Sequence, residues 1–114
     1  MPLDNLIKLL QELCGTVKEQ GSLLPAEPYP GRFFTFWNRS TDDHKHYDNA
    51  TYGYVWEVDV NFYSESPKDV YNTLEAAREK LLQAGWRING KGHAVASDEA
   101  THTGRGFTAF YLEI

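Results

Sequence analysis

Apolar and polar residues alternate most clearly between residues 54 and 63. A repeat of two residues is typical of a β-strand with one buried face and one solvent-facing side. We therefore expect a strand here, with its two faces divided between two sets of alternate positions. The set expected to be buried is Tyr54, Trp56, Val58, Val60 and Phe62, and the opposite set is Val55, Glu57, Asp59, Asn61 and Tyr63.

A helix is predicted directly after this strand, over residues 67–84. Ser66 is a suitable N-cap, Pro67 fits the first helical position, and Asp69 favours the positive end of the helix dipole. Gly85 suits the left-handed position that ends a helix. Apolar residues recur at helical spacing and predict a buried stripe made of Val70, Leu74, Ala77, Leu81 and Ala84.

Residues 3–20 predict another helix, because apolar residues recur there every three or four positions. Gly21 is expected to end it. The single cysteine, Cys14, lies on the apolar side, which favours a small buried hydrophobe over a reactive thiol. Residues 22–31 contain three prolines and predict an extended strap across the surface.

The remaining segments alternate between aromatic or apolar runs and polar loops. Residues 32–38 predict an aromatic strand, and the polar stretch 39–51 is expected to be the tip of a long hairpin leading to the 54–63 strand. Residues 86–88 predict a short strand that ends at an Asn-Gly turn. A long loop over 91–104 and a final strand over 105–114 complete the chain.

This order of elements, α-β-β-α-β-β, predicts an α+β fold. The economical arrangement is a two-layer sandwich, in which one antiparallel four-stranded sheet carries both helices on one face. With 114 residues, the chain is long enough for one domain, residues 1–114, with a substantial core.

The composition of the chain argues against nucleic-acid and membrane partners. A formal net charge of −5 argues against nonspecific duplex binding, which needs Lys and Arg to displace counterions from phosphates. No stretch approaches the roughly 20 apolar residues that span a bilayer, and the N-terminus does not resemble a signal peptide. We expect neither a membrane nor a specific nucleic-acid sequence as partner. Three Trp, seven Tyr and six Phe are many rings for a small core, so some are expected in an interface.

Histidines and carboxylates in the two loops are the candidates for metal or acid–base chemistry. His44 and His46 form an H-x-H pair beside Asp42 and Asp43, but a third ligand at a defined spacing is missing. A similar group in the second loop consists of His93, Asp98, Glu99 and His102. No nucleophile elbow, phosphate loop or H-E-x-x-H motif is present, so no catalytic residue, metal or cofactor is expected.

Both loops are longer than their connections require, and loops on a rigid sheet commonly carry binding functions. We therefore expect them to contact other subunits or partners. The candidate interface residues are Asp42, Asp43, His44, His46, Tyr47, His93, Asp98, Glu99, His102 and Arg105.

Residues 96–111, with the sequence ASDEATHTGRGFTAFY, resemble the C-terminal segment of small tail proteins encoded by tailed phages and prophages. The aromatic residues 33–37 and the strand from Trp56 to Phe62 before a helix add to this likeness. The family is the tail-terminator, or tail-completion, group of long-tailed phages. The resemblance runs from about residue 31 to the end and includes the order of elements.

The resemblance implies a ring of copies, usually six, on the last ring of the tail tube. Such a ring stops tube polymerisation and presents a surface to the head connector. The implied partners are therefore other copies of the chain, the tail-tube protein and a head-connector or neck protein. The resemblance implies no cofactor, and it places the protein in the virion tail after assembly in the bacterial host cytoplasm.

The outer face of the 54–63 strand gains a possible role from such a ring. It carries Glu57, Asp59 and Asn61 in a row without a basic residue among them. An acidic lining keeps passing DNA mobile by repulsion, whereas Lys and Arg hold phosphates back. We expect this row to face the lumen; the alternative is an ordinary solvated face.

Three other readings stay open on the sequence alone. They are a head-side neck protein of the same architecture, a small α+β module that binds a peptide or host protein at a free sheet edge, and a small metal-dependent enzyme that uses the His-rich loops. The oligomeric state separates a ring from a monomeric module, and tight stoichiometric metal favours the enzyme.

Overall fold

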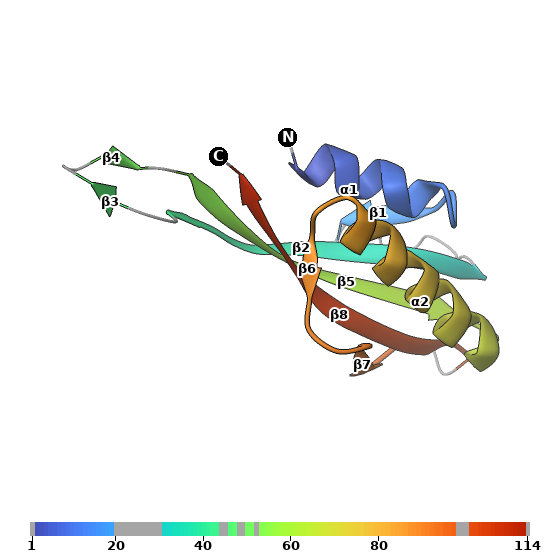
Figure 1. The fold of residues 1–114 in the computed structure, drawn as a ribbon. Helices are drawn as coiled ribbons and strands as arrows, with labels where there is room; N and C mark the ends of the chain where they lie inside the picture. The colour runs from blue at the N-terminus through green and yellow to red at the C-terminus, as the bar shows by residue number, and fades with distance from the viewer. Residues whose placement is uncertain are drawn as a thin grey trace.

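Two helices lie on one face of a six-stranded sheet in the computed structural model of the chain (Figure 1). The structure describes residues 2–19, 31–43, 46–47, 50–51, 53–97 and 101–113. The helices are α1 (Pro2–Gln11) and α2 (Pro67–Gln83). The strands are β1 (Val17–Glu19), β2 (Arg32–Asp43), β3 (His46–Tyr47), β4 (Ala50–Thr51), β5 (Tyr54–Ser64), β6 (Arg87–Ile88), β7 (His93–Val95) and β8 (Thr103–Glu113).

The sheet follows the order β1-β2-β5-β8-β6, and β7 also pairs with β8. β1 runs parallel to β2, whereas the pairings of β5 with β2 and of β8 with β5, β6 and β7 are antiparallel. β5 is the central strand, since β2 and β8 flank it along its whole length. β3 and β4 form a separate two-stranded sheet between β2 and β5.

The core lies between the helices and one face of the sheet. Val58, Val60 and Phe62 alternate along β5 and are fully buried, as the period of two predicts. The helices contribute their apolar stripes to the same cluster: Leu6, Leu10, Val70, Leu74, Ala77 and Leu81. The prediction that both helices share one face of the sheet is therefore confirmed.

The predicted start of α2 is confirmed, and so is the left-handed role of Gly85 just beyond its end. The Ser66 side chain accepts a hydrogen bond from the backbone N–H of Asp69 at 3.4 Å, and Pro67 occupies the first turn. Gly85 has φ +98°, the left-handed conformation that a residue with a side chain rarely adopts. The helix ends one residue earlier than predicted, and Ala84 is exposed rather than part of the buried stripe.

The prediction of one helix over residues 3–20 is wrong beyond Gln11. The carbonyl of Leu10 accepts from the N–H groups of both Leu13 and Cys14 at 3.0 Å, which closes the helix with a turn. The chain then forms β1, whose Val17 pairs with Phe34. Leucine spacing continued through this turn, so periodicity alone did not mark the end of the helix. Cys14 is buried, as predicted.

The predicted hairpin between β2 and β5 is confirmed, but its loop is shorter than the expected 39–51. β2 continues to Asp43, which pairs with Tyr54 at the start of β5. Polar side chains do not prevent this pairing, because backbone groups make the ladder and residues 39–41 are exposed or partly exposed. The second predicted loop, 91–104, likewise contains β7 and the start of β8.

The predicted α+β class is confirmed, but the four-stranded antiparallel sheet is wrong. Short strands that carry little sequence signal, β1 and β7, extend it to a mixed sheet of six. The short strand at 86–88 appears as β6, followed by Gly90 at φ +73°. The expected strap over residues 22–31 lies outside the described residues except for Gly31. Within the described chain, neither helix has the length and apolarity needed to cross a membrane.

Candidate functional site

The face of the sheet opposite the helices, called the outer face below, is the candidate functional surface. β5 alternates along its length, so Glu57, Asp59 and Asn61 point away from the core formed by its other side chains. All three are partly exposed. The sequence prediction placed these residues in one row on a wet face, and this part of it is confirmed.

Arg39 changes the electrostatics of that row. The β2–β5 register shifts between Asn38 and Ser40, so Arg39 occupies a β-bulge and has no partner residue on β5. Its Nε lies 3.5 Å from Glu57 Oε2 and 3.7 Å from Asp59 Oδ2. The row itself holds no basic residue, but this cation from the neighbouring strand β2 pairs with it. Sequence reasoning missed this cation because strand alternation does not reveal a bulge.

A second polar contact holds Asp59. The Thr108 hydroxyl on β8 donates a hydrogen bond of 2.8 Å to Asp59 Oδ1. Asp59 thus contacts side chains from both neighbouring strands, Arg39 from β2 and Thr108 from β8. Because the side chains of Glu57 and Asp59 keep exposures of 29% and 34%, these carboxylates remain open to a partner or to solvent.

Two glycines of β8 shape the outer face beside this row. A Cβ on Gly106 would lie 2.7 Å from the backbone oxygen of Val60 and would overlap the Asn61 amide. A Cβ on Gly104 would lie 2.6 Å from the Tyr63 ring. The larger side chains of β5 therefore lie across the glycines of β8. The G-x-G pattern that the sequence analysis used only as a family likeness has this steric role.

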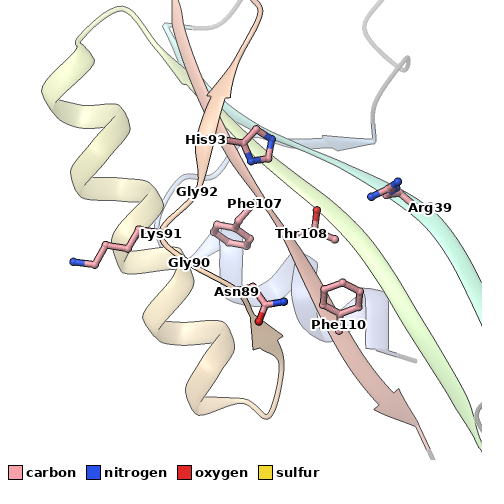
Figure 2. Close-up of a pocket in the computed structure, with 9 residues that line it drawn as sticks. All are labelled: Arg39, Asn89, Gly90, Lys91, Gly92, His93, Phe107, Thr108 and Phe110. Carbon is pink, nitrogen blue, oxygen red and sulfur yellow. The ribbon is translucent and has the colours of Figure 1, made fainter.

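A hollow of about 290 Å³ opens where the turn after β6 meets the outer face (Figure 2). Figure 2 shows the Phe107 ring between His93 and Asn89 and the Phe110 ring beyond Asn89, with Lys91 directed away from both rings. Gly92 has φ +107° and lies close to the backbone of Gly106, which brings this turn onto β8. The remaining lining residues are Arg39, Gly90 and Thr108.

The two loops predicted to contact other subunits or partners lie at opposite ends of the sheet. Asp42, Asp43, His46 and Tyr47 belong to the β2 end and to β3, beyond the start of β5. The second group flanks the start of β8, which pairs with the far end of β5. His44, Asp98 and Glu99 lie outside the described residues. The structure therefore does not bring the two groups together.

Members of the second group have structural contacts of their own. His102 is buried, with its ring 6.1 Å from that of Phe33. Arg105 lies over the Tyr71 ring at 4.6 Å and donates to the Gly92 carbonyl at 3.0 Å. His93 is exposed on β7. Among the described side chains, no three His, Cys, Asp or Glu residues converge as a metal site requires.

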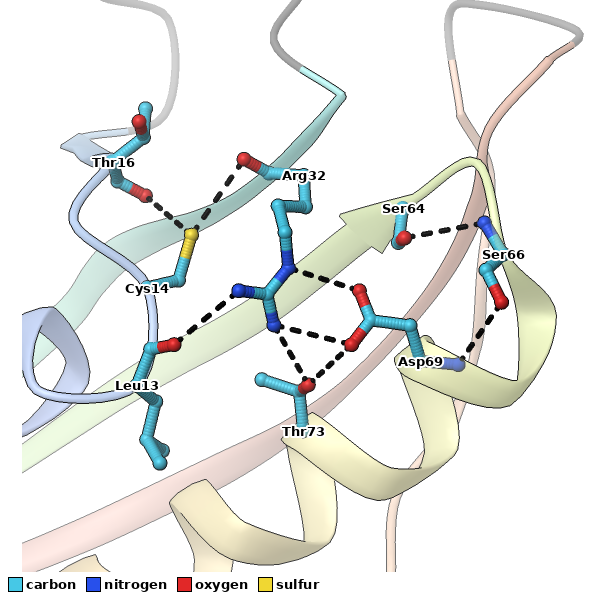
Figure 3. Close-up of polar contacts among 8 residues, drawn as sticks. All are labelled: Leu13, Cys14, Thr16, Arg32, Ser64, Ser66, Asp69 and Thr73. Atoms are coloured by element: carbon cyan, nitrogen blue, oxygen red, sulfur yellow. Dashed lines mark hydrogen bonds and ion pairs between the residues drawn. The ribbon is translucent and has the colours of Figure 1, made fainter.

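A polar cluster on the helix side ties β2 to the start of α2 (Figure 3). The Arg32 guanidinium donates to both carboxylate oxygens of Asp69, at 3.0 and 3.1 Å, and to the Thr73 hydroxyl at 3.0 Å. Burial pushes the pKa of Asp69 upward, but hydrogen bonds from Arg32 and Thr73 outweigh it and hold the pKa below its ordinary value. The hydrogen bond to Asp69 raises the pKa of Arg32. This arrangement is an anchor between two elements.

Several large apolar side chains are exposed, in line with the expectation that some aromatic rings lie in an interface. Trp37 is 48% exposed on the outer face, where its backbone pairs with Asp59. Contiguous exposed apolar surface commonly marks a binding region. Among the residues whose burial the structure describes, the other large exposed apolar ones are Tyr54, Tyr71, Leu82 and Leu112.

Comparisons with known proteins identify a shared fold. No known protein family and no curated protein sequence matches the chain. A chain in the solved structure "Virion of native gene transfer agent (GTA) particle" is similar, with a TM-score of 0.56 and 16% sequence identity. The match covers 91% of this chain and 83% of that chain. At this identity the similarity is one of architecture, and it extends over nearly the whole domain.

Proposed function

We propose that this protein is a structural component of a phage-like virion, and that it acts there as the tail terminator. In this role, copies of the chain form a ring that caps the tail tube, stops its polymerisation and offers a surface to a head-connector protein. The role needs no cofactor and no catalytic residue. Assembly takes place in the cytoplasm of a bacterial host.

The observation that carries the proposal is the fold similarity to a chain of a gene transfer agent virion over 91% of this protein. The resemblance of residues 96–111 to tail-terminator proteins supports the same class from independent features of the sequence. The outer face adds a physical argument. Its partly exposed ion pairs and exposed Trp37 suit a surface that binds other proteins.

The arrangement of the outer face also suggests how the ring meets DNA. We place Glu57, Asp59 and Asn61 on the lumen side of the ring. Arg39 offsets part of the negative charge, so the row repels phosphates less strongly than two free carboxylates. The lining is therefore weakly acidic and hydrogen-bonding, which leaves DNA mobile without a high charge that would oppose ring closure.

The two sets of candidate interface residues then serve different contacts, since they lie at opposite ends of the sheet. We assign the end with Asp42, Asp43, His46 and Tyr47 to a neighbouring subunit. We assign the other end, which includes His93 and the connection to β8, to the tail-tube protein or the head connector.

Deletion of the gene in the strain that produces the particle tests this proposal. Electron microscopy is expected to show tail tubes of uncontrolled length without heads, because nothing stops polymerisation, and the intact gene supplied in trans restores uniform tails. Tails of normal length that lack heads would instead indicate a head-side neck protein. Normal, infectious particles would exclude both virion roles and favour a binding module.

A further inference from the structure

One edge of the sheet concentrates basic residues in a chain whose formal net charge is −5. Residues 84–97 include β6, the turn after it and β7, and they contain Arg87, Lys91 and His93 but no Asp or Glu. All three basic residues are exposed. We call residues 84–97 the basic edge.

The basic edge has no acidic partner within the part of the chain that the structure describes. No described carboxylate forms an ion pair with Arg87, Lys91 or His93. The described basic residues that do form such pairs are Arg32, Arg39, Arg78 and Lys80. The basic edge can therefore meet the carboxylates of another molecule without breaking an internal ion pair, which favours an acidic partner.

Two of the three basic side chains project to the outer face of the sheet. Arg87 pairs with Phe110 and His93 pairs with Gly106, and these two residues of β8 pair in turn with the outer-face row of β5. Directly paired residues of neighbouring strands point to the same face. Because four residues of β8 separate the two pairing positions, they lie about 13 Å apart along the strand. Lys91 differs, since its side chain is directed away from the hollow (Figure 2).

Apolar surface connects the two outward-facing basic residues. The hollow of Figure 2 reaches from His93 to Phe110, the partner of Arg87, with Thr108 also in its lining. A second recess of about 540 Å³ continues from Phe110 to Arg87 and to Leu112, which is 42% exposed. Since Phe110 lines both hollows, a partner that reaches both basic residues also covers exposed apolar groups.

Two arginines hold the turn that forms one wall of the first hollow. Arg78 Nε of α2 donates a hydrogen bond to the Gly90 carbonyl at 2.8 Å, and the Arg105 guanidinium of β8 donates to the Gly92 carbonyl at 3.0 Å. Both glycines have positive φ, +73° and +107°, which the tight turn requires. Because the helix and the sheet both fix this turn, binding of a partner requires little ordering of the site.

We propose that the basic edge binds an extended acidic segment of another virion protein. One carboxylate of the segment meets Arg87, a second carboxylate four residues away meets His93, and an apolar side chain between them enters the hollow beside Phe110. Residues i, i+2 and i+4 of an extended chain lie on one side, as this arrangement needs. The inference rests on the proposed function for the source of the segment, and it adds the chemistry of the contact with the tail-tube protein or the head connector.

A nucleic acid fits this surface less well than an acidic polypeptide. The carboxylates of Glu57 and Asp59 lie on β5, the strand next to β8, and Arg39 offsets only part of their charge. They repel a continuous row of phosphates, whereas a peptide places its carboxylates only at the basic residues. The apolar lining beside Phe110 also suits a side chain better than a phosphate.

The first experiment titrates the ¹⁵N-labelled full chain with a terminally blocked peptide, Thr-Ser-Glu-Thr-Phe-Thr-Glu-Ser-Thr, and follows the amide signals by NMR. The peptide has two Glu side chains and one Phe side chain on one side of an extended backbone. Saturable shifts are expected in the basic edge and in residues 106–110 of β8. A peptide with Gln in place of both Glu residues is expected to bind about tenfold more weakly, because it lacks the two charges.

Charge reversal at two positions of the basic edge tests the geometry. Arg87→Glu is expected to weaken binding of the Glu peptide by about tenfold or more, because like charges then face one another. Lys91→Glu is the matched control: it makes the same change of charge in the same segment, but its side chain is directed away from the hollow. At physiological salt it is expected to weaken binding by less than about threefold. Equal weakening by both variants would overturn the inference.

The same NMR signals distinguish the other possible occupants. A thymidine oligonucleotide that shifts the amides of the basic edge at lower concentration than the Glu peptide would show that the edge binds phosphates. Shifts of these amides on raising the protein concentration alone would show that a second copy occupies the edge. Either result would overturn the inference, and so would the absence of shifts at about 1 mM Glu peptide.

Particle assembly in the producing strain separates failure of this inference from failure of the proposed function. Arg87→Glu is expected to lower the yield of complete particles, whereas Lys91→Glu leaves the yield unchanged. A normal yield from Arg87→Glu, in a strain where deletion of the gene abolishes complete particles, would leave the virion role intact and reject only this inference. Binding of the Glu peptide together with normal particles from the deletion strain would instead reject the proposed function and keep the basic edge as a site for acidic segments.

Discussion

The central strand β5 contributes side chains to both faces of the sheet, and different forces stabilise the two faces. On the helix side of β5, Val58, Val60 and Phe62 are fully buried. On the outer side, Glu57 and Asp59 keep about a third of their side-chain surface exposed and are held by Arg39 and Thr108. Burial is non-directional and scales with area, whereas the polar contacts are individually weak in water.

Because of this difference, the helix side of the sheet mainly determines stability, and the outer side is available for binding. The helix side supplies most of the free energy of folding, so changes there are expected to unfold the protein. The outer side contributes little to stability and is free to change its partners. Substitutions on the two sides therefore differ in what they damage, and the following four predictions test that contrast from the largest effect to the smallest.

Leu74→Ala is expected to lower the free energy of unfolding by about 2–5 kcal/mol, because Leu74 is only 2% exposed and the change leaves a cavity. Urea unfolding followed by circular dichroism measures the loss. Leu82→Ala on the same helix is the control, since Leu82 is 37% exposed and its truncation is expected to cost under about 0.5 kcal/mol. Equal losses in both variants would show that the helix face assignment is wrong.

Gly106→Ala is expected to cost about 1–3 kcal/mol, since the new methyl group lies too close to the backbone oxygen of Val60 and cannot be relieved by moving a side chain alone. The measurement is the midpoint of thermal unfolding. Gly15→Ala is the matched control, because a Cβ there meets nothing within 4 Å. A neutral Gly106→Ala variant would show that the outer face tolerates more volume than the close contact indicates.

Asp69→Asn is expected to cost about 1 kcal/mol, a value reduced from that of a buried pair because the Arg32 side chain is 44% exposed. The folded-state pKa of Asp69 lies below its ordinary value of 3.8, so this contribution is fully present above that pH and is lost as the pH falls through the lower folded pKa. The variant should therefore lose less stability than the wild type between neutral and strongly acidic pH. Urea titrations at several pH values check the sign; identical pH dependence would contradict the role of the anchor.

Glu57→Lys combined with Asp59→Lys is expected to keep the fold and to cost at most about 1 kcal/mol, somewhat more than for isolated surface charges because Arg39 then faces two cations. If this row lines the ring, tails assemble normally but release of DNA is slower, since Lys binds phosphates. Time-resolved ejection from purified particles measures the effect. Arg39→Ala is the control, and particles with this variant are expected to release DNA at least as fast as the wild type. Normal release of DNA by the double variant would show that the row does not line the lumen.

Prediction from the sequence was correct where a signal is local. The cap at Ser66, the left-handed Gly85 and the alternation along β5 each depend on a residue's own conformational preference or on the pattern of its neighbours. The candidate outer-face row at Glu57 and Asp59 followed from the same alternation. Its placement on a wet face needed no tertiary information.

It failed where pairing partners decide the structure. β1 and β7 have three residues each and exist as strands because β2 and β8 present free edges to them. A turn at the Leu10 carbonyl ends α1, although the helical spacing of apolar residues continues beyond this turn. The sequence also does not show that the two loops lie at opposite ends of the sheet.

The sequence by itself determined the class of the fold, the start of α2, its end to within one residue, and the alternation along β5 from Glu57 to Phe62, since these follow from short-range preferences and from the period of hydrophobic residues. Only the tertiary structure decided the mixed six-stranded sheet, the position of Arg39 between two carboxylates and the glycines beneath Asn61 and Tyr63. These features depend on register. A bulge of one residue moves a side chain to another set of neighbours without leaving a mark in the local pattern.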